Sequence, residues 1–490
     1  MSDRSFDYTD ENKALFFFED ISAIPRESGN EEGVAEYLMG FAAERGLDAE
    51  KDSVGNVIIR KDASEGREDE EPLILQAHMD MVCEKIPESS HDFRKDPIKL
   101  IVDGDILRAD GTTLGADDGI GVALCLAALD DDELSHPPLE VLITVEEETT
   151  FKGAGGAEQK YFRGRRIINL DHAVEHQVLC GSSGGEACHV RIPVDECETP
   201  EGLVAYRLSI NGMNGGHSGE DIHRGYGSAI QLMTRMLRRM SGEIKELHLA
   251  GISGGTNRLA ISRDAEAVVL AAGKDEGKLR ELVDESAKLF GREYNVTGKG
   301  MSVTCEKIDA PALMFTDGSF KNIISLLTVA PDGIQKMSGA VPGVVESSLN
   351  IGEIRILPGD EGQKQFEFVA EVRGSFRSTV TDIIDKLKCC AALFGGEVIT
   401  HDRYSAWSYD PDSKLRARAI QVYRDTFGEE LEPVAVHAGI EIGLFMDEFD
   451  QLDAISLGPD CWSFHSPDEH MSISSARREW KFLKALLAEV

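Results

Sequence analysis

The stretch Gly111-Thr-Thr-Leu-Gly-Ala-Asp-Asp-Gly-Ile-Gly121 decides how the rest of the chain is interpreted. It places two adjacent carboxylates, Asp117 and Asp118, in a glycine-rich turn, and the apolar run 120–129 follows at helical density. Glycine lets a backbone approach another group closely, and carboxylates are favoured where a helix begins. Taken alone, Asp-Asp-Gly is most simply a helix cap beside a solvated residue. The segments on either side indicate a different role.

Short apolar segments around this turn end in residues that can bind a metal or move a proton. Segments 73–79, 139–145 and 166–170 have the length and composition of buried strands, and they alternate with helical segments. This alternation predicts a mostly parallel sheet covered on both faces. In such sheets ligands bind at the carboxyl ends of the strands. Those ends carry His78, Asp80, Glu147, Glu148 and Asp171.

The pattern of apolar and polar residues changes near residue 188. From there to residue 406, strands that alternate apolar and polar residues are interleaved with amphipathic helices, which is typical of an α+β domain. Strand–helix–strand elements recur roughly twice, which favours a duplicated module. The final segments resemble a return to the first domain. We therefore expect a three-layer α/β catalytic domain at 1–187 and 407–490, with a mixed, mostly parallel sheet, and an inserted domain at 188–406.

Charge and composition exclude several classes of protein. The 490 residues carry a net charge of −37, which repels nucleic acid and anionic membrane surfaces. No apolar run reaches the ~18 residues that a membrane span needs. Nine cysteines without a Cys-x-x-Cys pair, and a polar start that lacks the features of a signal peptide, predict reduced thiols and a cytoplasmic location.

Five residues form a candidate set of metal ligands. They are His78, Asp117, Glu148, Asp171 and His465. Two imidazoles and three carboxylates without a thiolate suit Zn²⁺, with Mn²⁺ or Co²⁺ possible. Five ligands exceed the need of one closed site, so a shared carboxylate would serve two ions and leave positions open for water.

Four further residues are candidates for catalysis and binding. Asp80 is placed to hold an imidazole N–H of His78, and Glu147, beside a ligand, is a natural general base for the attacking water. His217, in a glycine-rich loop of the inserted domain, is a candidate to stabilise an oxyanion, which would require the two domains to close. Arg373 would either clamp a carboxylate or form a surface ion pair.

Seven short motifs, in this order along the chain, resemble those of the M20 metallopeptidases, and most closely their aminoacyl-histidine (Xaa-His) dipeptidase branch. The resemblance extends from about residue 11 to the C-terminus. It implies a di-zinc amidohydrolase of the phosphorylase/hydrolase-like α/β type, with an inserted ferredoxin-like domain that serves as a lid or in dimerisation. The motifs are HMD (78–80), GADDG (115–119), the Glu147-Glu148 pair in TxxEE, NLD (169–171), GGHSG (215–219), HAGIE (437–441) and HSPDE (465–469).

The resemblance also implies a role for each matching residue. Asp117 matches the ligand that bridges two zinc ions; His78 and Asp171 match the ligands of one ion, and Glu148 and His465 those of the other. Glu147 matches the general base, Asp80 the residue that orients His78, and His217 the oxyanion-stabilising histidine of the lid. Positions that line the substrate pocket are matched by Arg373, His437 and Glu441.

The sequence departs from the family pattern in three places. Thr150 replaces the glycine that usually follows the Glu-Glu pair, which puts the shape of that loop in question. Asp118 stands where close relatives often carry Asn. Glu146 makes the register of the pair ambiguous by one residue, and we choose 147 and 148 because Thr144 then keeps its spacing to the pair.

The expected activity is hydrolysis of dipeptides with a free N-terminus, including Xaa-His and β-alanyl-histidine dipeptides. Alternatives within the same chemistry are an N-acyl amino acid deacylase and an aminotripeptidase. A metal-binding scaffold without activity is the alternative from another class. The expected partner is a small peptide, and a homodimer, in which His217 acts within one chain or across the pair, is compatible with the inserted domain.

Overall fold

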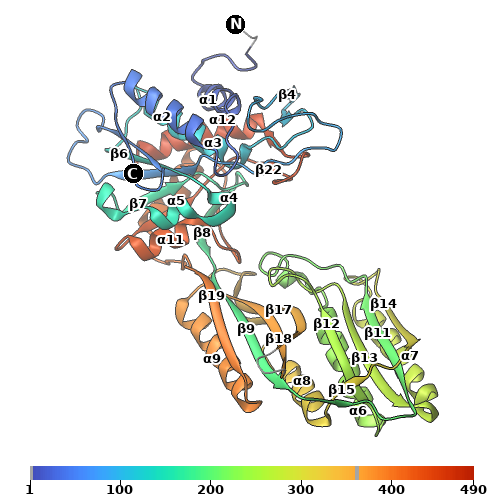
Figure 1. Ribbon diagram of the computed structural model, residues 1–490. Coiled ribbons are helices and arrows are strands. Elements are labelled where there is room, and N and C mark those ends of the chain that lie inside the picture. Colours follow the sequence, from blue (N-terminus) through green and yellow to red (C-terminus); the bar gives the residue numbers. More distant parts are fainter. Residues whose placement is uncertain (1–3, 359–362) are drawn as a thin grey trace. The chain divides into compact units, whose positions relative to one another are not determined.

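The computed structural model describes residues 4–358 and 363–490 (Figure 1). They form two compact units, each with its own sheet and hydrophobic core. The first unit contains the chain up to Gly181 together with Trp407–Ala435 and Ile440–Val490, and the second contains Ser182–Ala406 with Val436–Gly439. Within the described residues, no helix is both long enough and apolar enough to pass through a lipid bilayer.

A mixed eight-stranded sheet forms the centre of the first unit. In sheet order its strands are β1 (Asp48–Lys51), β2 (Val57–Lys61), β6 (Leu139–Thr144), β3 (Leu73–His78), β7 (Arg166–Asn169), β21 (Asp453–Ser456), β8 (Gln177–Ser182) and β20 (Glu432–Val436). The middle is parallel, since β3 pairs in parallel with β6 and β7, and β7 with β21. The pairs β1–β2, β2–β6 and β21–β8 are antiparallel. Strands β3 and β6 are buried at every position, which explains their almost continuous apolar sequence.

Helices cover both faces of this sheet (Figure 1). Side chains on one face, such as Leu75 and Ile143, join a single core with five helices. The alternate side chains, such as Ile74 and Leu142, are also buried, and α5 (Lys152–Gly156) packs against α11 (Glu441–Glu448) on that side. The five helices of the first face are α1 (Lys13–Ser22), α2 (Glu32–Glu44), α3 (Ala116–Asp130), α10 (Lys414–Phe427) and α12 (Ile473–Leu487).

Helix α3 anchors the turn that carries Asp117. Its residues from Ile120 to Leu129 are all buried, as expected for a helix that is apolar on every side. Each fully buried Val or Leu side chain contributes about 1.5–3 kcal/mol to stability. Because α3 packs against both α1 and β3, the start of the helix is held beside the end of that strand.

A small four-stranded sheet brings the C-terminal part of the chain to the same region. Its order is β22 (Cys461–Trp462), β23 (His470–Ser472), β5 (Ile106–Ala109) and β4 (Leu100–Asp103). The pairing of β23 with β5 is antiparallel and places Met471 opposite Leu107. The loop between β22 and β23, which contains His465 and Glu469, is therefore fixed at both ends.

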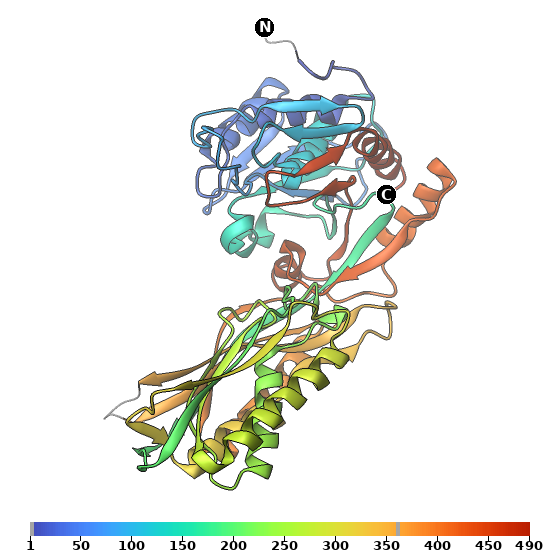
Figure 2. The ribbon, with the colours of Figure 1, turned by 90° about the vertical axis from the view of Figure 1, so that its right-hand side faces the viewer.

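The second unit is an antiparallel sheet with helices along one face (Figure 2). In sheet order the strands are β14 (Ser302–Ile308), β11 (Leu203–Asn211), β13 (Ala265–Ala272), β12 (His248–Gly254), β17 (Val345–Pro358), β18 (Lys364–Gly374), β9 (Gly184–Val194) and β19 (Glu397–Tyr404), with β16 (Gly333–Met337) beside β17. The helices are α6 (Ala229–Glu243), α7 (Glu276–Glu293), α8 (Asp317–Val329) and α9 (Arg377–Leu393). Outside this sheet, β10 (Glu196–Glu198) pairs with β15 (Leu313–Phe315).

The order of strands shows that one βαββαβ module is inserted into another. The elements β11–α6–β12–β13–α7–β14 form the first module, with sheet order β14-β11-β13-β12. The elements β9–α8–β17–β18–α9–β19 form the second, with sheet order β17-β18-β9-β19, which is the same ferredoxin-like arrangement read from the other edge. The first module lies in the chain between β9 and α8.

The limits of the two units differ slightly from the predicted domains. A boundary after residue 187 would cut β9, which pairs with β18 along its whole length, so the second unit begins at Ser182. Residues Val436–Gly439, predicted in the catalytic domain, belong to the second unit, because Ser183 donates a backbone hydrogen bond to Ala438 and Ser348 is bonded to His437.

Candidate active site

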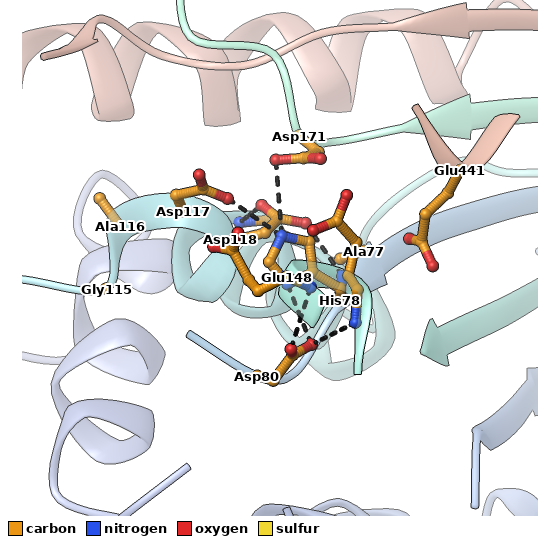
Figure 3. Close-up of polar contacts among 12 residues, drawn as sticks. Ala77, His78, Asp80, Gly115, Ala116, Asp117, Asp118, Glu148, Asp171 and Glu441 are labelled. Atoms are coloured by element: carbon orange, nitrogen blue, oxygen red, sulfur yellow. Dashed lines mark hydrogen bonds and ion pairs between the residues drawn. The ribbon is translucent and has the colours of Figure 1, made fainter. Parts of the chain in front are cut away.

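Seven of the predicted residues come together where the parallel strands of the first unit end. Figure 3 shows His78, Asp80, Asp117, Glu148 and Asp171 among them. His78 is the last residue of β3, and Asp171 lies two residues after β7. Glu147 begins the short helix α4 (Glu147–Thr150), which follows β6. Parallel neighbouring strands end at the same edge, so residues far apart in sequence meet there. The others are Asp80, Asp117, Glu148 and His465.

The Asp117 carboxylate lies between the two imidazoles. Its Oδ1 is 3.0 Å from His78 Nε2, and its Oδ2 is 3.3 Å from His465 Nε2. One more carboxylate lies near the same nitrogen of each ring: Asp171 Oδ1 is 3.8 Å from His78 Nε2, and Glu148 Oε2 is 3.0 Å from His465 Nε2. Each half of the site therefore has one imidazole, one carboxylate of its own and one oxygen of Asp117.

Asp80 connects the His78 ring to the start of α4. Its Oδ1 is 3.4 Å from His78 Nδ1, and Ser28 Oγ donates to its Oδ2 at 2.7 Å. The same carboxylate accepts the backbone N–H groups of Glu147 at 3.0 Å and Glu148 at 3.2 Å. In the neutral ring that a metal ion requires, a carboxylate beside Nδ1 favours the tautomer with the proton on Nδ1, so that the Nε2 lone pair lies on the side of Asp117.

The three consecutive glutamates point to different partners. Glu146 forms an ion pair with Lys152, whereas Glu148 contacts His465. Glu147 joins His78 and Glu148 in one of the groups of donor atoms that could hold a metal ion. The register chosen from the Thr144 spacing thus places 147 and 148, and not 146, beside the imidazoles.

The donor atoms fit divalent metal ions. Among the described residues, three groups with donor atoms within 4.8 Å of one another could hold an ion: His78–Asp118–Asp171, His78–Glu147–Glu148 and Asp117–Glu148–His465. Imidazole and carboxylate are ligands that Zn²⁺, Mn²⁺ and Co²⁺ accept. The groups overlap at His78 and Glu148, so the cluster is larger than one closed site.

Carboxylates crowd this cluster, and burial together with their charges raises the pKa of several of them. Burial and the charges of Asp117 and Asp118 raise the pKa of Asp171 well above its usual value. Burial, together with neighbouring acidic groups, also raises the pKa of Glu147. Burial disfavours the charged form of His78, but its hydrogen bonds to Asp117 and Asp80 outweigh this and raise its pKa. The cluster is thus rich in negative charge that bound cations would balance.

Asp118 has a role that the sequence left open. The peptide bond that joins it to Asp117 is cis. Its side chain is buried and both oxygens are bonded to the backbone: Oδ1 accepts the backbone N–H of Gly121 at 3.0 Å, and Oδ2 accepts that of His78 at 3.1 Å. Asp118 therefore caps the regular part of α3 and ties it to the end of β3. The capping role considered in the sequence is present, with a second bond added.

Two buried residues that the sequence analysis did not assign hold the Asp117 turn. Glu469 accepts four backbone N–H groups with its two oxygens: those of Leu114 (2.7 Å) and Gly115 (2.9 Å) on Oε2, and those of Ala116 (2.8 Å) and Asp117 (3.4 Å) on Oε1. Glu469 is only 2% exposed. The motif HSPDE was visible in the sequence, but nothing in it indicated which partner its glutamate has.

Arg26 is the second of these residues. It donates to the carbonyl groups of Met79 at 3.2 Å, Asp80 at 2.9 Å and Gly115. Gly115 has a φ of +69°, and a side chain there would overlap the guanidinium group. The sequence suggested that these glycines give room for a metal ligand to approach. In the structure, the group that approaches Gly115 is Arg26, and the one that approaches Gly121 is the Asp118 carboxylate.

Glu441, predicted to line the substrate pocket, is buried in the first unit beside this cluster. Its Oε2 accepts hydrogen bonds from Gln76 at 2.7 Å and Thr144 at 2.9 Å. Burial raises the pKa of Glu441 to about 7. Its charge in turn raises the pKa of Glu147. Glu441 therefore influences the protonation of the cluster by its charge, from a buried position beside it.

The remaining three predicted residues gather within the second unit. Arg373, on β18, has its Nη2 3.5 Å from His217 Nε2, and its Nη1 donates to Tyr404 Oη at 2.6 Å. His437 Nε2 is 2.7 Å from Ser348 Oγ. Burial and the charge of Arg373 lower the pKa of His437 to about 3. The predicted residues thus form two clusters, one within each unit.

His217 is held as a hydrogen-bond donor. The backbone N–H of Glu220 donates to its Nδ1 at 3.2 Å, so the proton of the neutral ring lies on Nε2. Burial and the charge of Arg373 lower the pKa of His217, which keeps the ring neutral. Its Nε2–H and the guanidinium of Arg373 are two donors that face each other, and a negatively charged oxygen is the group that both could bind.

Comparison with known proteins agrees with this architecture. The chain is 35% identical over 473 residues to the cytosol non-specific dipeptidase of Escherichia coli (strain K12), with 96% of each sequence covered. Its structure matches the crystal structure of aminoacylhistidine dipeptidase from Vibrio alginolyticus with a TM-score of 0.90, 34% identity and 98% of each chain covered. A tripeptidase from Staphylococcus aureus shares the fold at a TM-score of 0.56 and 15% identity.

A three-layer α/β unit with a His/Asp/Glu cluster at its strand ends, interrupted by paired ferredoxin-like modules, defines a metal-dependent hydrolase. The chain belongs to the peptidase family M20/M25/M40, whose sequence model matches residues 74–489. It is a peptide hydrolase. The family, the fold class and the type of reaction expected from the sequence are confirmed.

Proposed function

We propose that the protein is a di-zinc dipeptidase that hydrolyses dipeptides with a free N-terminus, Xaa-His dipeptides among them. The observation that carries this proposal is the position of the Asp117 carboxylate, whose two oxygens face two different imidazoles at 3.0 and 3.3 Å. The relatives at 34% and 35% identity are both named dipeptidases, which favours a dipeptide over a longer or N-acylated substrate.

The ligand roles follow from the two halves of the cluster. His78 and Asp171 would hold one ion, Glu148 and His465 the other, and Asp117 would bridge them. When bound, such a metal pair supplies Lewis acidity toward the scissile carbonyl and toward water. Mn²⁺ or Co²⁺ suits the same donors.

The residues of the chain supply the proton transfers. Glu147 accepts a proton from the attacking water and passes it to the leaving amine. Asp80 fixes the His78 tautomer through Nδ1 and, by accepting the backbone N–H of Glu147, also positions the general base. One carboxylate thus orients both a ligand and the base.

His217 and Arg373 are proposed to bind negatively charged groups of the reacting peptide. The Nε2–H of His217 would donate to the developing oxyanion, and Arg373 would hold a carboxylate of the substrate. His437, neutral because of burial and Arg373, would contact the substrate as an uncharged imidazole. Glu441, which is buried, would raise the pKa of the Glu147 carboxylate through its charge.

A substrate panel on metal-reconstituted protein tests the proposal. Free dipeptides that vary at each position, β-alanyl-histidine, tripeptides and N-acetylated amino acids are compared by kcat/KM. We expect turnover of free dipeptides, including Xaa-His, and at least about tenfold lower kcat/KM for tripeptides and acylated compounds, because a site built around the peptide's free termini leaves those partners unpaired. Preference for an acylated amino acid or a tripeptide would contradict it.

We further propose that the enzyme acts in the cytoplasm and forms a homodimer. The Escherichia coli relative carries the word cytosol in its name, which supports the first part. Light scattering coupled to gel filtration measures the second, and a monomer at catalytic concentration would exclude it.

A further inference from the structure

Two histidines that belong to neither cluster described above meet on the sheet of the second unit. His189 lies on β9 and His401 on the edge strand β19, and their Nε2 atoms are 2.8 Å apart. The side chains are 20% and 39% exposed. The neighbours of His189 in sequence, Cys188 and Val190, belong to the core under the helices, so the pair lies on the opposite face of the sheet.

The other nitrogen of each ring is already occupied. His189 Nδ1 is 3.0 Å from Glu367 Oε1, and His401 Nδ1 is 3.0 Å from Asp402 Oδ2. Both carboxylates are ionised: Arg191 donates to Glu367 at 2.7 Å, and Arg258 forms an ion pair with Asp402 at 3.1 Å. An ionised carboxylate can only accept, so both Nδ1 atoms carry hydrogen.

The two Nε2 atoms then face each other with lone pairs. Two neutral rings in this tautomer repel at 2.8 Å, and the arrangement needs a positive species between them. A carboxylate behind each imidazole, with the free nitrogens converging, is the environment that orients histidine ligands of metals. Neither His189 nor His401 has a part in the proposed reaction.

The distance between the nitrogens selects the class of cation. With metal–nitrogen bonds of about 2.0 Å, a tetrahedral angle separates two nitrogens by about 3.3 Å, whereas a right angle separates them by about 2.8 Å. The 2.8 Å found here corresponds to adjacent positions of a tetragonal ion. Cu²⁺ and Ni²⁺ prefer that geometry, and Cu²⁺ binds nitrogen ligands most strongly among the divalent ions of its row.

We propose that His189 and His401 form a second, surface metal site for a tetragonal divalent cation, and that this site binds Cu²⁺ most strongly. Water completes the coordination on the exposed side. The ion links the edge strand β19 to β9 three residues before Tyr404, the partner of Arg373. Bound metal therefore fastens the end of the sheet where β19 has an irregular register between His401 and Tyr404.

Copper binding to the zinc-loaded protein tests this site. Cu²⁺ is titrated into the full-length enzyme in the presence of excess Zn²⁺, and bound copper is counted by electron paramagnetic resonance, which also shows coupling to imidazole nitrogen. The variants are His401→Gln and His189→Gln. The matched control is His248→Gln, because His248 lies on the same sheet with Asp317 3.0 Å from its Nδ1 but is not bonded to a second imidazole in the described chain.

We expect the wild type and the His248→Gln control to bind one more Cu²⁺ per chain than either variant of the pair. Copper is also expected to raise the Tm of the wild type and the control more than that of the two variants. Circular dichroism without metal checks that each variant is folded, and the use of two independent positions keeps the comparison valid if one fails. Equal copper uptake by all four proteins, or the same loss in His248→Gln, would overturn the assignment and leave a shared proton between the rings.

Discussion

Glu469→Gln is the substitution that most directly tests how the active-site turn is held. The carboxylate accepts four backbone N–H groups, two on each oxygen. Glutamine keeps one oxygen and replaces the other with an NH₂ group, which is itself a donor. Whichever way the amide turns, two N–H groups of residues 114–117 lose their acceptor and face another donor.

The structure sets the size of the effect. A buried donor without a partner costs about 1–3 kcal/mol, so two of them cost about 2–6 kcal/mol in a turn that is otherwise excluded from water. Part of this cost appears as lower stability, and part as displacement of Asp117, whose own N–H is one of the four. Loss of a residue that positions a metal ligand typically lowers metal affinity about 10–100-fold.

The assay is metal affinity measured by competition with a chromophoric chelator on apoprotein, together with the Tm of the apo form. We expect Glu469→Gln to weaken Zn²⁺ binding at least about tenfold and to lower the apo Tm by several degrees. Asp468→Asn is the matched control, because it removes one negative charge from the adjacent, exposed position of the same loop. Zinc affinity within twofold of the wild type in Glu469→Gln would refute the reasoning, since the turn would then not depend on this carboxylate.

Three further outcomes are expected. Glu147→Gln lowers kcat at least about 100-fold without loss of bound metal, as steady-state kinetics and elemental analysis will show. In the control Glu146→Gln, which changes only an ion pair with Lys152, kcat stays within about twofold of the wild type. Removal of metal with a chelator abolishes peptide hydrolysis and lowers the Tm because the carboxylate cluster loses its counter-charge, and Zn²⁺, Co²⁺ or Mn²⁺ restores both. Burial and the charge of Glu175 raise the pKa of Glu479 from 4.5 to about 8, so the folded state retains a proton that the unfolded state releases, and stability falls as the pH rises between these values. Glu479→Gln should therefore raise stability at pH 8 by an amount on the order of 3 kcal/mol and leave it unchanged at pH 4, as thermal unfolding across pH will show.

The sequence was sufficient for the parts of the site that follow from local pattern. His78 ends a strand, and Glu147 and Asp171 follow one. The apolar run of each strand is visible in the local sequence, and parallel pairing brings such strand ends together. Asp117 was found because the apolar helix after it is equally visible. These predictions needed only the spacing of apolar residues in each segment and the rule that ligands bind at the carboxyl ends of parallel strands.

The parts that the sequence did not show depend on pairs of residues far apart in the chain. Glu469 meets Ala116 across 353 positions, and His189 meets His401 across 212. Neither pair has a local signature, because the sequence near a glutamate or a histidine does not show whether that side chain is buried or has a partner elsewhere in the chain. The limits of the units were displaced for a similar reason: the pairing of β9 with β18 decides where the second unit begins, and that pairing joins segments that the chain separates widely.

The backbone N–H groups of the turn already have other acceptors, which explains how the Asp117 carboxylate is free to serve as a ligand. A carboxylate at the start of a helix would ordinarily accept the unpaired N–H groups there. Here Glu469 accepts the N–H groups of residues 114–117, and Asp118 accepts that of Gly121. Because these bonds are already made, both oxygens of Asp117 remain directed at the two imidazoles. The adjacent aspartates therefore divide two tasks between them, and loss of the cap at Asp118 or of the cradle at Glu469 should draw Asp117 back toward the backbone.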